Sequence, residues 1–134
     1  MSQASVEVVL EQFAATNDRD FARAMSYYAE EVELVVPPSA FLQRGTFKGR
    51  EAVGGWFGDW FSSFEPGYRF DIEEAREVGD VVLLVASHRG RGRSSGAEVR
   101  GQNAYLYTVR EGKIARVELY ASRAAALEAA GTPE

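Results

Sequence analysis

His88 is the only histidine in the chain, and imidazole is the side chain best suited to proton transfer near neutral pH. An apolar run at residues 81–86 precedes it, so we expect a strand that ends near His88 and could aim the ring into a cavity mouth. A histidine at a strand end more often lies at the surface or in an interface, and catalytic residues are rare among candidates. We therefore treat His88 as a weak catalytic candidate, with Glu33 and Glu118 as potential partners.

Trp56, Trp60 and Phe64 recur at helical spacing within a predicted helix over residues 50–64. Large rings on one helix face could line a cavity for a flat apolar molecule. An aromatic stripe more often fills a core, but core aromatic residues can also form a pocket wall. Three glycines in the same segment cost roughly 1 kcal/mol each in helix propensity, so packing must hold this helix.

Four arginines surround the segment GRGRSSG at residues 90–96: Arg89, Arg91, Arg93 and Arg100. They could hold an anionic ligand, and the segment could act as a lid, but a solvated hairpin tip is the commoner explanation. The segment lacks the lysine and the strand–loop–helix context of a P-loop, which argues against nucleotide binding by that route. One histidine among scattered carboxylates makes no metal site, so we expect neither metal nor cofactor.

Composition narrows the class of protein. The 134 residues suit one domain, spanning residues 1–134. With no cysteine the chain has no disulfide or thiolate site, and its net charge of −5 argues against a nucleic-acid partner. The N-terminal residues lack the pattern of a signal peptide, and no apolar run could span a membrane. These features predict a cytoplasmic protein without nucleic-acid or membrane partners.

The order of periodic segments predicts an α+β fold. Helices are expected first, over residues 6–14, 21–28 and 50–64, with a short one at 124–130. Strands are expected at residues 31–36, from 68 onward, at 81–89 and in a long hairpin over 98–122 that turns at Glu111-Gly112. Residues 39–48 are predicted as a loop that could double back as a strand. A phase change predicts a β-bulge near Ala115-Arg116.

The hairpin and the strand before it carry apolar residues on both faces, whereas an antiparallel sheet usually leaves one face polar. We therefore expect a second copy of the chain to cover the second face. Tyr105, Tyr107 and Tyr120 are predicted for that dimer face, with Leu106 on the cavity side. A register error of one residue would reverse this assignment.

Several segments, taken in order, resemble the nuclear transport factor 2-like superfamily, which includes ketosteroid isomerase and the SnoaL-like polyketide cyclases. The matching segments are residues 17–21, 28–33, 47–53, 110–114 and 126–131, with Tyr120 near the end of the last strand. The resemblance implies a cone-shaped α+β barrel of the cystatin-like type, with N-terminal helices packed on a curved antiparallel sheet and a cavity at the open end. It also implies a homodimer through the convex sheet face. Superfamily members include enzymes and non-catalytic modules, so the fold does not decide function.

The resemblance also shows which catalytic positions are changed. Val36 stands where ketosteroid isomerases carry their base, and Phe13 stands near their tyrosine donor. Their acidic donor falls near Gln102 or Ala104, of which Gln102 could still donate a hydrogen bond. The acid/base residue of the cyclases is replaced by Ala121 or Ser122. Proton transfer by the ketosteroid isomerase mechanism is therefore not expected.

Two functional hypotheses follow. The first is a small-molecule-binding SnoaL-like domain with an apolar cone cavity, with acid–base chemistry on a small hydrophobic substrate if it is an enzyme. The second is a non-catalytic dimerisation or ligand-carrier module. An open cavity that holds a polar group would favour the first. The residues expected to line that cavity are Phe13, Val36, Trp56, Trp60, Phe64, His88, Gln102 and Leu106.

Overall fold

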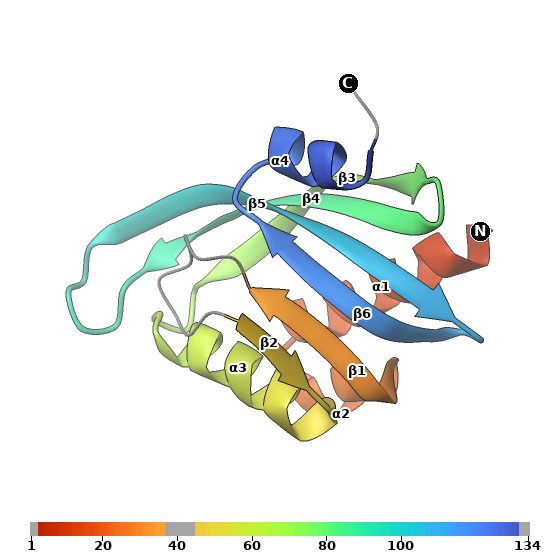
Figure 1. Ribbon diagram of the computed structural model, residues 1–134. Helices are drawn as coiled ribbons and strands as arrows, with labels where there is room; N and C mark the ends of the chain where they lie inside the picture. The colour runs from red at the N-terminus through yellow and green to blue at the C-terminus, as the bar shows by residue number, and fades with distance from the viewer. Residues whose placement is uncertain (1–2, 37–44, 132–134) are drawn as a thin grey trace.

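The computed structural model describes residues 3–36 and 45–131 (Figure 1). Its helices are α1 (Gln3–Asn17), α2 (Phe21–Ser26), α3 (Arg50–Ser62) and α4 (Arg123–Ala129). Its strands are β1 (Tyr28–Val36), β2 (Gly45–Lys48), β3 (Arg69–Val78), β4 (Val81–Arg91), β5 (Glu98–Arg110) and β6 (Lys113–Tyr120).

Within these described ranges, six strands form one curved sheet in the order β2-β1-β6-β5-β4-β3. The predicted α+β fold is confirmed. Neighbouring strands are antiparallel except for β1 and β6, which are parallel and bring the first and last strands of the chain together. The second half of the predicted loop is the edge strand β2, antiparallel to β1. Residues 39–44 of that loop lie outside the described residues.

The long hairpin forms as the sequence predicts. Its two-residue turn places Glu111 and Gly112 at φ 53° and 77°, the left-handed conformation that glycine adopts without strain. Thr108 lies opposite Arg116, whereas the next residue of β5 lies opposite Ile114. Ala115 is therefore the extra residue of a β-bulge, which confirms the predicted position.

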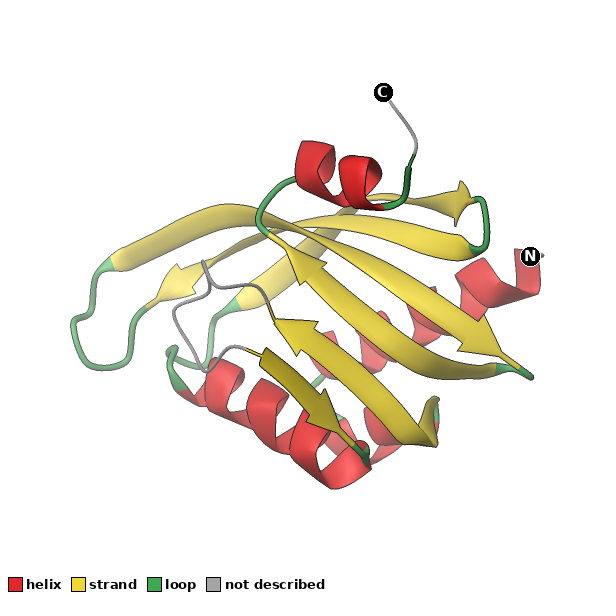
Figure 2. Ribbon diagram, in the orientation of Figure 1, coloured by secondary structure: helices red, strands yellow, loops and turns green. Residues whose placement is uncertain are grey.

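Helices α1, α2 and α3 cover the concave face of the sheet (Figure 2). Gln12 of α1 donates a hydrogen bond of 3.1 Å to the hydroxyl of Tyr28, which is fully buried at the start of β1. The predicted second helix extended to Tyr28, but α2 ends two residues earlier, and the chain is already extended there. Asn17, the last residue of α1, exchanges two hydrogen bonds with the backbone of Phe70 in β3. These contacts attach α1 to β1 and to β3, which lie toward opposite edges of the sheet.

Helix α4 covers part of the convex face, on the side of the sheet opposite α1–α3 (Figure 1). Leu127 is 1% exposed and packs with Leu83, Leu106 and their neighbours. Arg123 at the start of α4 donates two hydrogen bonds, of 2.6 and 3.2 Å, to the Glu74 carboxylate on β3. The apolar side chains that led us to expect a second copy on this face are therefore covered by the chain's own C-terminal helix.

The predicted facing of β5 is wrong by one residue. Tyr105 and Tyr107 belong to the main core on the concave face, where α1–α3 leave room for large rings. Leu106 points the other way and packs beneath α4. Gln102 shares the convex face with Leu106 by strand alternation, and its amide donates a 2.7 Å hydrogen bond to Glu73. Gln102 and Leu106 are therefore absent from the cone interior.

Candidate functional site

The open end of the cone contains a narrow space that we call the aromatic gap. Its lining residues are Trp56, Phe57 and Trp60 of α3, Phe70 of β3, Asn103 and Tyr105 of β5, and Leu119 of β6. The empty volume between these side chains is about 170 Å³, but it admits no water-sized sphere. The described residues therefore hold the gap closed, so the open cavity that the sequence predicted is not found among them, and a ligand would have to displace side chains to enter.

Two tryptophans form the helix side of the aromatic gap. Trp56 and Trp60 are four residues apart, so they lie on the same face of α3. Their rings stack with centroids 5.5 Å apart and an interplanar angle of 25°. Phe57 meets Trp56 edge to face at 5.1 Å. The sequence placed both tryptophans correctly in the cone, and they give the gap a flat apolar wall.

Asn103 is the polar side chain in the lining of the aromatic gap. It lies next to Tyr105 on the concave side of β5, and burial raises the pKa of Tyr105 although a hydrogen bond from Asn103 opposes that rise. The sequence analysis missed Asn103 because it assigned the cavity side to Gln102 and Leu106. The signal was the alternation of Asn103 with two tyrosines, which a correct register would have turned inward.

His88 ends a chain of hydrogen bonds at the rim of the core. The indole N–H of Trp60 donates to the Tyr68 hydroxyl over 2.9 Å, and that hydroxyl lies 2.8 Å from His88 Nδ1. Burial lowers the pKa of His88 and raises that of Tyr68, so both groups stay neutral near pH 7.

The proposed partners of His88 lie elsewhere. Glu33 accepts a 2.7 Å hydrogen bond from Arg116, and Glu118 accepts one of 2.9 Å from the same guanidinium. The His88 ring instead lies over Gly101 of β5, where an added Cβ would come within 2.7 Å of Nε2. The absence of a side chain at Gly101 therefore gives the imidazole its place on the concave face.

The remaining predicted residues are part of the core around the gap. Val36, at the end of β1, is 3% exposed. Phe13 packs edge to face with Phe70 at 5.2 Å and with Tyr105 at 5.8 Å. Phe64 stacks on Tyr68 with centroids 4.0 Å apart. Val36 and Phe13 carry no group that can donate or accept a proton.

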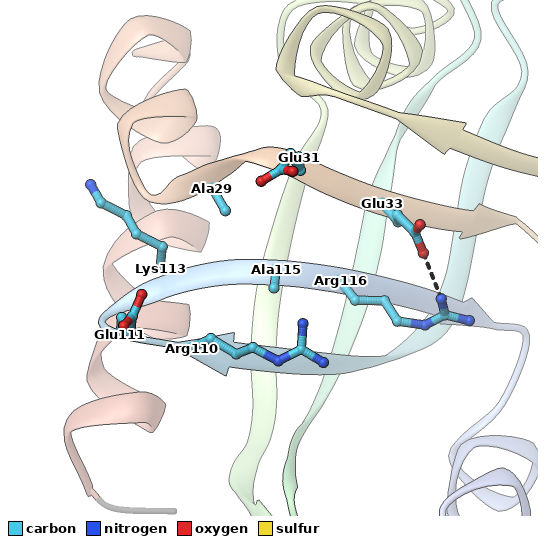
Figure 3. A pocket seen from close by; sticks show the side chains of 8 residues that line it. All are labelled: Ala29, Glu31, Glu33, Arg110, Glu111, Lys113, Ala115 and Arg116. Carbon is cyan, nitrogen blue, oxygen red and sulfur yellow. Dashed lines mark hydrogen bonds and ion pairs between the residues drawn. The ribbon is translucent and has the colours of Figure 1, made fainter.

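A second hollow lies on the convex face, over β1, β5 and β6 (Figure 3). We call it the charged groove; its volume is about 480 Å³, and its lining residues are Ala29, Glu31, Glu33, Arg110, Glu111, Lys113, Ala115 and Arg116. Glu33 and Arg116 form an ion pair across its floor. In the part of the chain that the structure describes, Arg110 and Glu31 make no hydrogen bond or ion pair. The groove thus presents unpaired charges of both signs.

Among residues 3–36 and 45–131, no group of histidine, aspartate and glutamate side chains gathers that could hold a metal ion. No helix within those ranges is both long enough and apolar enough to cross a membrane.

The chain belongs to the SnoaL-like domain family, whose model matches residues 9–117. A search of curated proteins found no match. Among solved structures, the chain resembles TerC co-crystallised with polyporic acid, at 23% identity, with 96% of this chain and 99% of that chain covered and a TM-score of 0.77.

Two further structures support the same fold. One is a hypothetical protein with a ketosteroid isomerase-like fold from Catenulispora acidiphila in complex with trimethylamine, at 24% identity, with 95% of this chain and 94% of that chain covered and a TM-score of 0.73. The other is a putative polyketide cyclase from Sinorhizobium meliloti, at 22% identity, with 85% and 94% covered and a TM-score of 0.66. At these identities the likeness establishes the nuclear transport factor 2-like fold.

Proposed function

We propose that the chain is a small-molecule-binding domain whose ligand, flat and largely apolar, enters the aromatic gap between α3 and the sheet. The observation that carries this proposal is the stacked Trp56–Trp60 wall with the polar Asn103 in the same lining. Binding sites of this kind are mostly apolar, with a few polar groups that orient the ligand. Relatives crystallised with polyporic acid and with trimethylamine support a ligand-binding role.

Ligand entry requires lining side chains to be displaced, since the gap admits no water-sized sphere, and we propose that α3 moves away from the sheet to allow this. Helix α3 is suited to such a movement. An added Cβ at Gly55 or Gly58 would meet nothing within 4 Å, so packing does not require glycine at either position. Each glycine nevertheless lowers helix propensity by about 1 kcal/mol relative to alanine.

We assign binding rather than proton transfer to this site. Val36 and Phe13 cannot act as acids or bases, and the Tyr68 hydroxyl occupies His88 Nδ1. His88 would reach a ligand only by breaking that hydrogen bond. A cytoplasmic location and a single domain over residues 1–134 remain predictions beside this proposal.

The two tryptophans of the chain both line the gap, so their indole N–H signals in an NMR spectrum report directly on binding. Titration with 2-naphthol, a flat aromatic probe, should shift both signals to saturation. Asn103→Leu should weaken the binding about fivefold to tenfold by removing the polar contact. Gln102→Leu is the matched control, because Gln102 is next to Asn103 in β5 but its side chain lies on the convex face, away from the gap. Indole signals that do not respond up to the solubility limit of the probe would refute the proposal.

A second candidate function, homodimerisation through the convex face, is favoured by the charged groove. Arg110 and Glu31 carry opposite charges. In a two-fold interface, Arg110 of each copy could pair with Glu31 of the other copy. Sedimentation velocity should then show a dimer that dissociates as salt rises. Arg110→Glu and Glu31→Arg should each weaken it, and the double variant should restore it. A monomer at every concentration and salt tested would exclude this function.

A further inference from the structure

Three arginines stand side by side across neighbouring strands at one end of the convex face. Arg69 of β3 lies directly opposite Arg89 of β4, and Arg89 lies directly opposite Arg100 of β5. Side chains directly opposite one another share a face of the sheet, and like charges in such positions destabilise the strand pair. We call these residues the arginine row. Nothing in the packing of the fold explains why three positive charges should be aligned here.

Nearby carboxylates neutralise the arginine row only in part. Asp71 lies 3.6 Å from Arg69 and 3.8 Å from Arg89, and Glu98 lies 3.3 Å from Arg100. Three guanidinium groups against two carboxylates leave an excess positive charge on a chain whose net charge is −5. Within the described residues, the guanidinium groups of Arg69 and Arg89 make no hydrogen bond. Their N–H donors are therefore available to a ligand.

Two neighbouring arginines, Arg91 at the end of β4 and Arg93 in the loop that follows, behave differently. Arg91 donates to the carbonyl of Gly96 over 3.1 Å. Arg93 donates to the carbonyls of Ser62 and Phe64, both over 3.0 Å, and so attaches the loop to the end of α3. These two arginines have a structural role that accounts for them.

A hollow of about 210 Å³ lies between two members of the row. Its lining residues are Asp71, Ser87, His88, Arg89, Arg100 and Gly101. A water molecule takes about 30 Å³ in the liquid, so the hollow has the volume of about seven waters, enough for a phosphate or carboxylate group. Ser87 lies two residues before Arg89 and so faces the same side, where its hydroxyl adds a further donor.

We propose that this hollow binds a small anion carrying a phosphate or carboxylate group. A planar guanidinium can donate two parallel hydrogen bonds to either group, which favours arginine over a point charge at such sites. The bound anion would also relieve the repulsion within the row. The donor side chains of this hollow, those of Ser87, Arg89 and Arg100, lie on the opposite face of the sheet from the aromatic gap, so the proposal does not depend on the function proposed for that gap.

NMR titrations of the whole chain with inorganic phosphate and, separately, with acetate test the proposal at constant ionic strength set with sodium chloride. The amide signals of Ser87 and Gly101 should shift to saturation with at least one anion, and which anion binds distinguishes the two groups. Arg89→Gln and Arg100→Gln should each weaken that binding about tenfold. Arg23→Gln, which removes an exposed arginine of α2 far along the chain from the row, should leave it unchanged.

The unliganded variants supply a second measurement. Relief of like-charge repulsion should raise the melting temperature of Arg89→Gln by about 1–4 °C, while phosphate or acetate affinity falls. Both substituted side chains are largely exposed, at 63% for Arg89 and 73% for Arg100, so the variants should fold. Two results would mean non-specific ion binding only and would overturn the proposal: shifts that never saturate, or shifts that Arg89→Gln and Arg23→Gln alter equally.

Discussion

Burial of His88 makes a prediction about pH. Its folded-state pKa is lowered from 6.5, so the unfolded chain binds more protons than the native chain between pH 6.5 and that lower value. Stability should therefore fall as pH drops from 6.5 through the folded pKa, and no further below it. His88→Gln removes the only histidine and should flatten the unfolding free energy, measured in urea, across this window. An NMR titration of His88 with a midpoint at or above 6.5 would contradict the prediction.

At the same scale, the sequence predicts which side chains are large and polar better than it predicts which way they face. His88, Trp56 and Trp60 are concave-facing, as their apolar or helical neighbourhoods indicated. Asn103 was missed because both alternating sets of β5 are mostly apolar, and tyrosines look more suited to a surface than leucine and alanine. The rings of Tyr105 and Tyr107 fill the core under the three helices, whereas Ala104 and Leu106 pack beneath α4.

The attachment of α4 is tested through Glu74. Hydrogen bonds from Arg123, and then from Arg76, lower the pKa of this carboxyl from 4.5 to about 2. A depressed folded-state pKa contributes stability above the unfolded value, and this contribution is lost as pH falls from about 4.5 toward 2. Since the pair is partly exposed, Glu74→Gln should cost only about 1 kcal/mol at pH 7. Urea unfolding from pH 7 to 3.5 should show this difference narrowing below pH 4.5.

Glu98→Gln is the matched control, because that carboxylate is 62% exposed and its one partner is also exposed. It should change stability by less than about 0.5 kcal/mol at either pH. An equal loss in both variants would mean that Glu74 is not the anchor of α4.

The glycines of α3 allow the proposed opening of that helix to be tested. An added Cβ at Gly54 would lie 2.9 Å from the sulfur of Met25, so this glycine makes room for the Met25 side chain of α2. Gly55→Ala meets nothing within 4 Å and should raise the unfolding free energy by up to about 1 kcal/mol. If α3 must loosen to admit a ligand, the same variant should weaken 2-naphthol binding. Unchanged affinity in a stabilised variant would remove α3 from the entry route.

For the whole molecule, hydrophobic periodicity and turn residues predicted the class of fold, the long hairpin and its bulge. They did not predict the parallel pairing of β1 with β6, because that contact joins segments about 80 residues apart whose local patterns are the same for either direction. The structure also changes which surface could form a dimer. The apolar part of the convex face is already covered by α4, so a dimer would form through the charged groove and not through uncovered tyrosines.

Leu127→Ala tests whether α4 is the cover that keeps this face from associating. Leu127 is buried against Leu83 and Leu106, so truncation should cost about 2–3 kcal/mol and loosen the helix. The apolar patch beneath would then be exposed, and light scattering should detect association that grows with protein concentration. Glu128→Ala changes the exposed neighbour and should do neither. If the two variants unfolded at the same urea concentration and both remained monomeric, α4 would not be what keeps the convex face from associating. A second copy would then again be the expected cover for that face.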